Sequence, residues 1–476
     1  MKRLLTCIFF LIAAILVSKA ENDDFSLEHV KNIGLKVIHI TTANHEEPTC
    51  DYLEAPEGCM GMTIANATKV PCRIVITQQS DTLYDSGEYE KSVIGTIIKI
   101  NGNTTAYFSK NENKPYKIKL QKKTDLLFRH DERFSDKEWR LLKDGVSLNT
   151  IIGLKISELL NFPWTPAYSP CNVFINGDYQ GCYLLIESVK RNKDCRLNVD
   201  KETGYIIERD AYWWKEDKYF STDYFASNKA YRWTWKYPDK DAVDDDQENY
   251  IRQFINSTEE SIKNGTYPSY IDIESFARWI LAQDILGIYD SGGTNLYLTK
   301  YDNTPLSLLQ MPVLWDFDSN FSIESGQFSR IHNARYDYYF YDLFNSDNKE
   351  FTIAYKQLWD QVRPSLLNSI SDFIQHYMDS EEGKALTISS QLNIKRWHYE
   401  DFPTLEEFAT AAINWFENHL PLLDKNIQQL DDRTSILSIS KRKKNNVLYN
   451  LTGQKVLNPK KGIYINQNGR KIIYHP

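Results

Sequence analysis

Three carboxylates and one amide gather in the second half of the sequence, where they could share one site. Asp290 follows a predicted helix, and Asn295 comes a few residues later. Asp316 and Asp318 form an Asp-x-Asp pair after a strand-like run. Carboxylate and amide oxygens are the hard ligands that Mg²⁺ or Mn²⁺ prefers, and phosphoryl transfer also needs an aspartate that orients the attacking hydroxyl. This chemistry fits Asp290 as the base, with Asn295 and Asp316 as metal ligands.

A structural role for the same residues stays open. Asp and Asn are common in turns and at helix ends, because their short polar side chains bond to nearby backbone groups. An Asp-x-Asp pair also occurs by chance in many chains. Spacing alone therefore favours turn and cap residues over a catalytic site.

Charged residues in the first half could complete such a site. Lys114, Lys117 and Lys119 lie on or beside a predicted strand that follows a glycine-containing loop, where a lysine can meet phosphate oxygens. From the residues alone, each is better explained as a solvated charge on a strand. Glu187 directly follows an apolar strand, and its position fits equally well a ligand for a nucleotide base and a plain surface residue.

Strands and one helix in the first half must position these residues. Two predicted strands, at 96–100 and 116–120, surround the Asn-Gly-Asn loop at 101–103. Apolar residues at helical spacing predict a helix over 147–161. Asn-Gly-Asp at 176–178 separates two apolar runs, which is the pattern of a tight hairpin.

The second half, from about 250 to 429, is predicted to be mostly helical, and 271–288 and 354–378 are its clearest periodic segments. A helix-poor interruption over 295–321 contains two strand-like runs. Between the halves, the aromatic-rich segment 213–235 is predicted to be an insertion or a surface crossing. Together these patterns predict an α+β fold.

Both ends of the chain carry segments outside this predicted core. Residues 1–20 combine a positive start, an apolar run and small final residues, which predicts a cleavable export signal. A membrane anchor is the alternative, but a run of about 14 apolar residues is shorter than the roughly 20 that span a bilayer. No later stretch predicts a membrane span. Residues 21–90 are predicted to be a β-rich lead-in, and 434–476 a small β tail.

Composition limits the classes of partner. A chain of 476 residues with 42% hydrophobic and 13% aromatic residues can build large cores. Its net charge is −8, and loss of Lys2, Arg3 and Lys19 with the signal would make it three charges more negative. Such a charge repels polyphosphate backbones, so nucleic acid is not an expected partner. Six cysteines remain after the signal and permit disulfides: Cys50, Cys59, Cys72, Cys171, Cys182 and Cys195.

A family resemblance rests on short blocks that occur in order over roughly residues 95 to 420. They are Lys114-Pro115-Tyr116-Lys117-Ile118-Lys119-Leu120, Trp139-Arg140-Leu141-Leu142, Trp164-Thr165-Pro166, the run from Asn176 to Glu187, Asn295-Leu296-Tyr297-Leu298 and Trp315-Asp316-Phe317-Asp318. These blocks resemble the spore-coat CotH kinase family. The resemblance implies an atypical, two-lobed protein-kinase domain over 91–430, with an N-lobe over about 91–200 and a C-lobe over about 250–430. It also implies ATP with Mg²⁺ or Mn²⁺ as cofactors, and Ser or Thr of exported proteins as substrate.

The same resemblance implies roles for individual residues. Asp290 matches the catalytic aspartate of the family. Asn295 matches the nearby amide ligand and Asp316 the metal-binding aspartate, with Asp318 in the same acidic pair.

The implied nucleotide contacts come from the first half of the chain. Lys117 is the favoured phosphate-binding lysine of its segment, and Glu187 would lie at the hinge beside adenine. Two departures from the family pattern stand out. Asn-Gly-Asn-Thr-Thr-Ala at 101–106 replaces Arg-Gly-Asn-Ser-Thr-Trp, so a positive charge near the nucleotide loop is missing. Ser322 follows Phe321 where the acidic block of the family runs into a glycine.

The sequence thus leads to a secreted, ATP- and metal-dependent protein kinase as the first hypothesis. A catalytically inactive surface adhesin or scaffold with the same fold is the alternative, and transfer of another part of the nucleotide is a third. The tail, with its blocks at 448–456, 461–465 and 468–471, resembles a type IX secretion sorting domain. That resemblance implies passage to the cell surface, and a small β module with no address role is the alternative.

Overall fold

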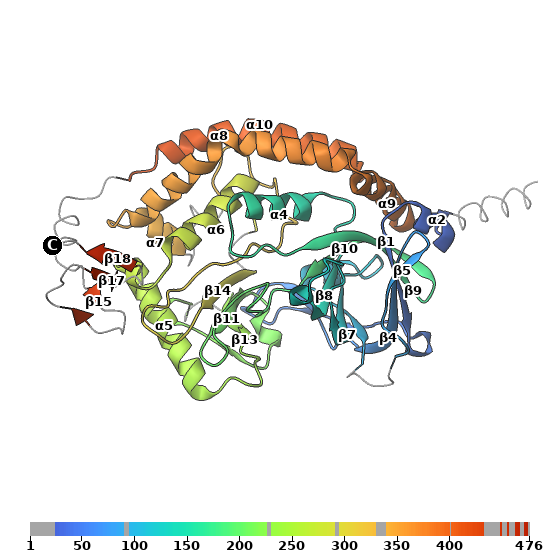
Figure 1. The fold of residues 1–476 in the computed structure, drawn as a ribbon, viewed down its shortest axis with the longest axis horizontal. Helices are drawn as coiled ribbons and strands as arrows, with labels where there is room; N and C mark the ends of the chain where they lie inside the picture. The colour runs from blue at the N-terminus through green and yellow to red at the C-terminus, as the bar shows by residue number, and fades with distance from the viewer. Residues whose placement is uncertain are drawn as a thin grey trace, which may run out of the picture.

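A computed structural model of the chain describes residues 24–89, 95–225, 230–290, 295–329, 339–399 and 401–432, and the backbone of four short strands between 448 and 474. The predicted export signal lies outside the described residues. The strands of the largest sheet gather at one end of the molecule, and the long helices α8 (Glu350–Asp379) and α10 (Leu405–Gln428) run along one side of it (Figure 1). The structure is therefore mixed, with both large sheets and long helices.

Seven strands close into a barrel. In sheet order they are β1 (Lys36–Thr42), β9 (Tyr168–Ile175), β10 (Asp178–Glu187), β8 (Asp136–Leu142), β7 (Tyr116–Thr124), β6 (Ile97–Ile100) and β4 (Val70–Gln78), and β5 (Asp81–Asp85) extends the sheet beyond β4. The barrel closes because β1 pairs with both β9 and β4. Strands from the predicted lead-in and strands that follow residue 95 thus share one sheet. The predicted hairpin is present, since β9 and β10 pair across the turn at 176–177.

The barrel owes its two faces to the alternation of side chains along each strand. One face forms a closed apolar interior that contains Ile98, Ile118 and Trp139, all fully buried. On the opposite face, Lys99 of β6 pairs in register with Lys117 of β7, which in turn pairs with Arg140 of β8. A row of three cations therefore crosses the outside of the barrel. Next to it stand a small hairpin of β2 (Asp51–Glu54) and β3 (Met62–Ala65) and the short helix α3 (Thr104–Phe108).

A second, antiparallel sheet lies beside the barrel. Its order is β12 (Tyr219–Phe220), β13 (Arg232–Tyr237), β11 (Tyr205–Asp210) and β14 (Leu296–Lys300). The prediction of an insertion or surface crossing over 213–235 is wrong, because Trp233 of β13 is fully buried in the main core. Its alternation was hidden by the exceptional aromatic content of the segment. β11 pairs with β13 on one side and with β14 on the other, so the aromatic segment and the interruption over 295–321 share one sheet.

Helices supply the rest of the main core. The predicted helix over 147–161 is α4 (Asn149–Leu159), that over 271–288 is α6 (Ile273–Leu286), and α8 begins slightly before the predicted 354. α5 (Asp245–Lys263) starts at a capping box of Asp244 and Gln247, which satisfies backbone donors of its first turn. α6 is buried almost all round and packs against α8 and α10. The short α7 (Tyr339–Asn345) completes this group.

Helix α9 (Glu381–Trp397) fixes the helices to the barrel. The side chain of Asn393 accepts a 3.1 Å hydrogen bond from the backbone N–H of Cys182, next to a bulge in β10 at Gly181. Trp397 donates from Nε1 to the carbonyl of Gln180 at 3.0 Å. Gly181 has φ +116°, and a Cβ there would lie 1.9 Å from Oδ1 of Asn393, so the contact depends on glycine.

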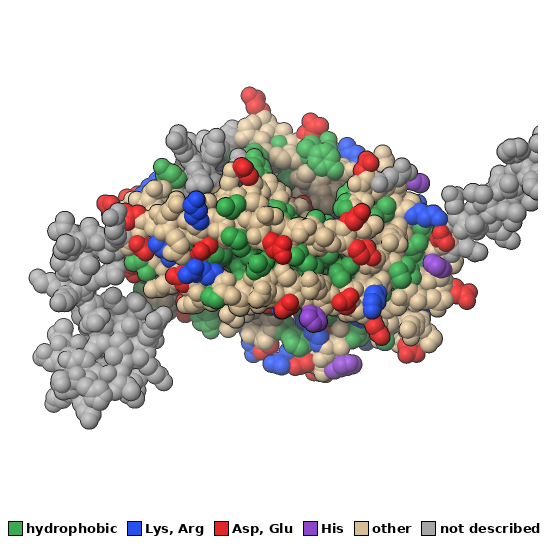
Figure 2. Space-filling model, turned by 90° about the horizontal axis from the view of Figure 1, so that it is seen from above, with side chains coloured by type: hydrophobic (Ala, Val, Ile, Leu, Met, Phe, Trp, Pro, Cys, Tyr) green, Lys and Arg blue, Asp and Glu red, His purple; other side chains and the backbone are tan. Residues whose placement is uncertain are grey.

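The outer face of α8 and α10 carries acidic side chains among scattered hydrophobic ones (Figure 2). None of the described helices is both long and apolar enough to cross a membrane. The described cysteines are free thiols, and three of them, Cys72, Cys171 and Cys182, are buried. At the far end of the chain, four short strands form a small sheet: β16 (Lys455–Val456), β15 (Leu448–Tyr449), β17 (Gly462–Asn466) and β18 (Lys471–Tyr474).

Candidate active site

The acidic residues predicted from the sequence do lie together in space. Helix α6 ends at Gly287, which adopts the left-handed conformation that glycine tolerates best. The chain then reaches Asp290, whose backbone N–H donates to Oγ of Ser319 at 3.3 Å. Asp290 thus stands beside the loop that carries Asp316 and Asp318, which we call the acidic loop (residues 315–320).

A direct hydrogen bond joins the predicted metal ligands. Nδ2 of Asn295 donates to Oδ2 of Asp316 at 2.6 Å, which leaves Oδ1 of Asn295 as the atom that can bind a cation. Both residues have positive φ, 59° for Asn295 and 70° for Asp316, a region that costs free energy for residues other than glycine. Such strain is often stored at functional sites, where the surrounding structure over-determines the backbone.

Desolvation and mutual repulsion together shape the electrostatics of the acidic group. Asp290, Asp316 and Asp318 are all exposed to solvent, but neighbouring protein atoms partly desolvate the carboxylates of Asp316 and Asp318. This desolvation, and then the charges of Asp318 and Asp290, raise the pKa of Asp316 well above its usual value. The pKa of Asp318 is raised for the same two kinds of reason, desolvation and the charge of Asp290. A divalent cation would relieve this repulsion.

The donor set fits a hard cation that also needs ligands from a substrate. Among the described residues, no three His, Cys, Asp or Glu side chains form a ready-made metal-binding group. Mg²⁺ in phosphoryl-transfer sites is commonly held by one or two carboxylates together with phosphate oxygens. Asp316, Asp318 and the amide oxygen of Asn295 match that incomplete protein set.

Helix α4 holds the acidic loop in place. Phe317 packs on Gly153 of α4, and Nδ2 of Asn320 donates to the carbonyl of Asn149 at 2.9 Å. Before the same helix, Asp144 accepts the backbone N–H of Thr150 at 3.0 Å. Burial, assisted weakly by the charge of Asp318, raises the pKa of Asp144 to about 6.

Basic residues meet the acidic loop from the barrel side. The guanidinium of Arg140 lies 5.7 Å from the ring centre of Trp315, the residue directly before Asp316. Its neighbour Lys117 forms a 3.0 Å ion pair with Glu138. Burial is the main cause that lowers the pKa of Lys117 to about 8, so the ammonium remains mostly charged at neutral pH. The cation row therefore continues up to the acidic loop.

Glu187 occupies a different environment from the one expected of an open nucleotide ligand. Its side chain is almost fully buried, and its carboxylate pairs with Arg129 at 2.9 Å and with Arg196 at 3.6 Å. It also accepts the backbone N–H of Ala167 at 3.1 Å. The carboxylate is thus engaged by protein groups, and its predicted contact with adenine stays a prediction.

These observations can be set against known protein families. The family model described as CotH kinase protein matches residues 98–382, which is more than half of the chain. The chain belongs to the CotH kinase protein family. No curated protein matched it. The resemblance found in the sequence blocks is thereby confirmed, and all six predicted site residues fall within the matched range.

The CotH family range also contains charged residues that the sequence analysis missed. Lys99 and Arg140 flank Lys117 on neighbouring strands, and Asp144 stands behind Asp318. Alternation could have placed Lys99 and Arg140 on the polar face of their strands. It could not have aligned them, because register between strands depends on tertiary pairing.

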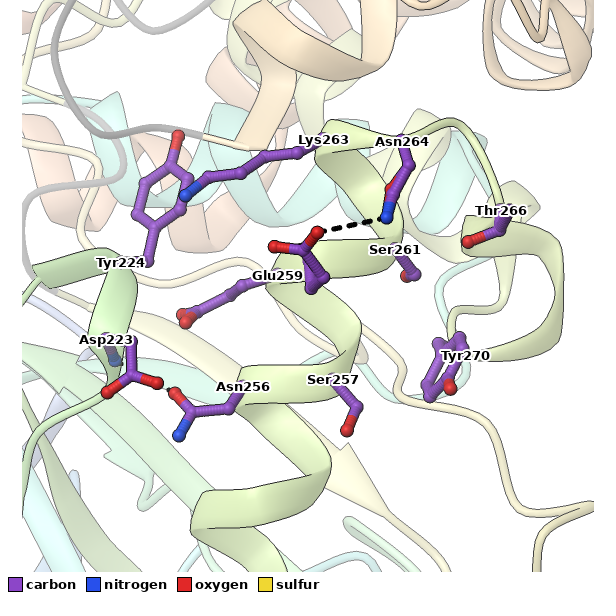
Figure 3. Close-up of a pocket in the computed structure, with 11 residues that line it drawn as sticks. Asp223, Tyr224, Asn256, Ser257, Glu259, Ser261, Lys263, Asn264, Thr266 and Tyr270 are labelled. Carbon is purple, nitrogen blue, oxygen red and sulfur yellow. Dashed lines mark hydrogen bonds between the residues drawn. The ribbon is translucent and has the colours of Figure 1, made fainter.

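A separate cavity of about 440 Å³ lies along α5 and includes none of the predicted site residues (Figure 3). Its lining is polar, and Glu259 in its wall is nearly fully buried. One carboxylate oxygen of Glu259 accepts hydrogen bonds from the hydroxyls of Tyr339 and Thr222, at 2.6 and 3.0 Å.

Proposed function

We propose that this protein is a metal-dependent kinase with a two-lobed architecture, which transfers the γ-phosphoryl group of ATP to Ser or Thr of exported or surface proteins. One juxtaposition carries the proposal: the cation row of the barrel meets the acidic loop where Arg140 stacks near Trp315. A triphosphate with a divalent cation needs both kinds of charge at one place, positive charge for the phosphates and hard oxygen ligands for the metal. Membership of the CotH family supports the same assignment.

Each residue of the site has a defined task in this proposal. Asp290, exposed beside the acidic loop, accepts the proton of the attacking hydroxyl on its carboxylate. Asn295 orients Asp316 through their 2.6 Å hydrogen bond. Lys117 faces phosphate oxygens with its ammonium. Asn295, Asp316 and Asp318 would hold Mg²⁺ or Mn²⁺, which would supply positive charge against the phosphate oxygens.

Transfer of label from ATP tests the proposal. The purified mature chain is incubated with γ-labelled ATP and Mn²⁺ or Mg²⁺, beside Asp290→Ala and Asp316→Ala. Loss of a base and of a metal ligand should each lower the rate by about 100-fold or more. Asp379→Ala, which changes an exposed aspartate at the end of α8, is the matched control and should keep full activity.

The label also separates the alternatives. Persistent γ-label in both site variants would refute the proposed site. Transfer from α-labelled ATP alone would favour transfer of a nucleotide part. Complete absence of transfer by the wild type, with either label, would favour an inactive surface-binding module. That alternative is supported by Asn101, which stands where the family pattern has an arginine.

Export and surface delivery are the remaining part of the proposal. The signal-like residues 1–20 and the tail resemblance over 434–476 support them. Deletion of 434–476 should leave the protein exported but no longer at the outer surface, as measured by fractionation and surface protease digestion. An unchanged surface fraction would leave the tail without an address role.

A further inference from the structure

The loop before α3 is held by a residue from the second sheet. Nζ of Lys215, which follows β11 in a short 3-10 helix (Trp213–Lys215), donates to Oδ1 of Asn103 and, at 2.9 Å, to Oγ1 of Thr63. Thr63 of β3 itself donates to Oδ1 of Asn103 at 2.7 Å. Three segments that are far apart in the sequence thus meet at the side chain of Asn103.

This engagement explains an unusual start of α3. Asn103 occupies the N-cap position, where asparagine ordinarily accepts a hydrogen bond from the helix backbone, yet it makes no side-chain cap bond. Its amide is committed to Lys215 and Thr63 instead. A helix as short as Thr104–Phe108 has little stability of its own, so external contacts must hold it.

A second contact comes from Tyr212. Its hydroxyl forms a hydrogen bond with Oγ1 of Thr104, the first residue of α3. Its ring lies against Gly61, where a Cβ would approach Cε1 of the ring to 2.4 Å. The charges of Asp290 and Asp316 act on the same phenol and contribute, after burial, to its raised pKa. Tyr212 therefore holds the first residue of α3 and lies within electrostatic reach of the acidic group.

Lys215 brings positive charge to the same place. Burial lowers the pKa of Lys215; the charges of Glu216 and Asp210 oppose this shift, and those of Lys236 and Lys99 add to it. Lys99 is the first member of the cation row that leads to Arg140. The ammonium of Lys215 thus extends that row to the loop at 101–103, which lacks a cation of its own.

We infer that Tyr212 and Lys215 are positioning residues, which hold the loop 101–103 and α3 in place beside the cation row and so set the affinity for nucleotide. The inference rests on the proposed function. It also gives a role to Gly61 and Thr63. The ring of Tyr212 packs on Gly61, and the ammonium of Lys215 donates to Thr63.

Binding of a fluorescent ATP analogue with Mg²⁺ tests this inference. Tyr212→Phe removes one hydroxyl and should weaken binding about three- to tenfold, and Lys215→Met should weaken it at least tenfold. Lys215→Arg keeps the charge and should restore most of the affinity. Tyr301→Phe, at an exposed tyrosine, is the matched control and should bind like the wild type. Hydrogen exchange of the α3 amides without nucleotide should be faster in Tyr212→Phe and Lys215→Met only.

A double-variant cycle sharpens the result. Thr104→Val removes the hydrogen bond with Tyr212 and also the 3.4 Å bond from Oγ1 of Thr104 to the carbonyl of Met62, so it should weaken binding at least as much as Tyr212→Phe. The double variant should be no worse than Thr104→Val, because Tyr212→Phe then has no further hydrogen bond with Thr104 to remove. Additive losses of affinity in the double variant would overturn the inference. So would Tyr212→Phe and Lys215→Met variants that bind nucleotide, and exchange their α3 amides, like the wild type. A wild type that binds no nucleotide would instead refute the proposed function. In that case, hydrogen exchange of the α3 amides that is slow in the wild type and faster in the variants would still establish that Tyr212 and Lys215 hold α3.

Discussion

The ring of Phe317 packs so closely on Gly153 that a Cβ on Gly153 would lie 2.1 Å from Cδ1 of the ring. This contact holds the acidic loop on α4, which in turn packs against α6 and α8 in the main core. The packing of Phe317 on Gly153 thus helps to fix the position of Asp316 and Asp318, together with the hydrogen bond from Asn320 to Asn149.

Gly153→Ala should loosen this contact. Overpacking of a tight site costs about 1–3 kcal/mol, which exceeds the gain of at most about 1 kcal/mol that alanine offers in a helix. Urea unfolding should show a lower free energy of unfolding, and nucleotide binding should weaken. Adding Phe317→Leu makes room and should recover part of the stability. A Gly153→Ala variant at least as stable as the wild type would show that the ring moves aside freely.

Mg²⁺ or Mn²⁺ should raise the melting temperature of the wild type, because a ligand that binds the folded state stabilises it. In metal-free buffer, Asp316→Asn should melt above the wild type, since it removes the repulsion that raises the pKa of Asp316. The same variant should respond weakly to metal. Melting scans with chelator and with each cation measure both effects. Equal metal shifts in the two proteins would place the cation elsewhere.

Lys117→Met should weaken nucleotide binding about tenfold or more, since a charge-assisted hydrogen bond contributes about 1.5–3 kcal/mol. Lys119→Met changes an exposed lysine on the same strand and should have little effect. Because Lys117 pairs with Glu138, the single variant also leaves a carboxylate unpaired. Lys117→Met with Glu138→Gln should therefore regain stability without regaining affinity. Titration of the fluorescent analogue and urea unfolding separate the two effects.

Asp284 should make stability depend on pH. It is fully buried, accepts hydrogen bonds from Tyr355 and Ser329, and burial raises its pKa to about 7 from 3.8. Between those values the unfolded chain loses the proton while the folded chain keeps it, so stability from this residue falls as pH rises from about 4 to 7. The penalty is complete above pH 7 and amounts to at most about 4 kcal/mol.

Asp284→Asn removes this titration while it keeps an oxygen acceptor. The variant should lose less stability than the wild type between pH 4 and 7, as measured by urea unfolding at several pH values. Since other groups titrate equally in both proteins, the difference between the two curves isolates Asp284. Parallel curves would mean that its carboxyl titrates normally.

Local patterns in the sequence predicted much of the secondary structure. Helical spacing located α4 and α6, and the Asn-Gly turn located the β9–β10 hairpin, because these signals depend on residues close together in the chain. The acidic group was also within reach of the sequence. Asp290 follows α6 and Asn295 precedes β14, and the short connection between these elements keeps the two residues close. Asp316 follows an extended stretch that forms no strand, although the sequence predicted one there.

Tertiary pairing decided what local patterns could not. Closure of the barrel by β1, alignment of Lys99 with Lys117 and Arg140, and burial of Trp233 all depend on which distant strands meet and in which register. The hold of Tyr212 and Lys215 on α3 and the loop before it belongs to the same class of feature. Periodicity tells which face of a strand is polar, but only the packed chain brings two polar faces together, because that choice is made by the whole core and not by neighbouring residues.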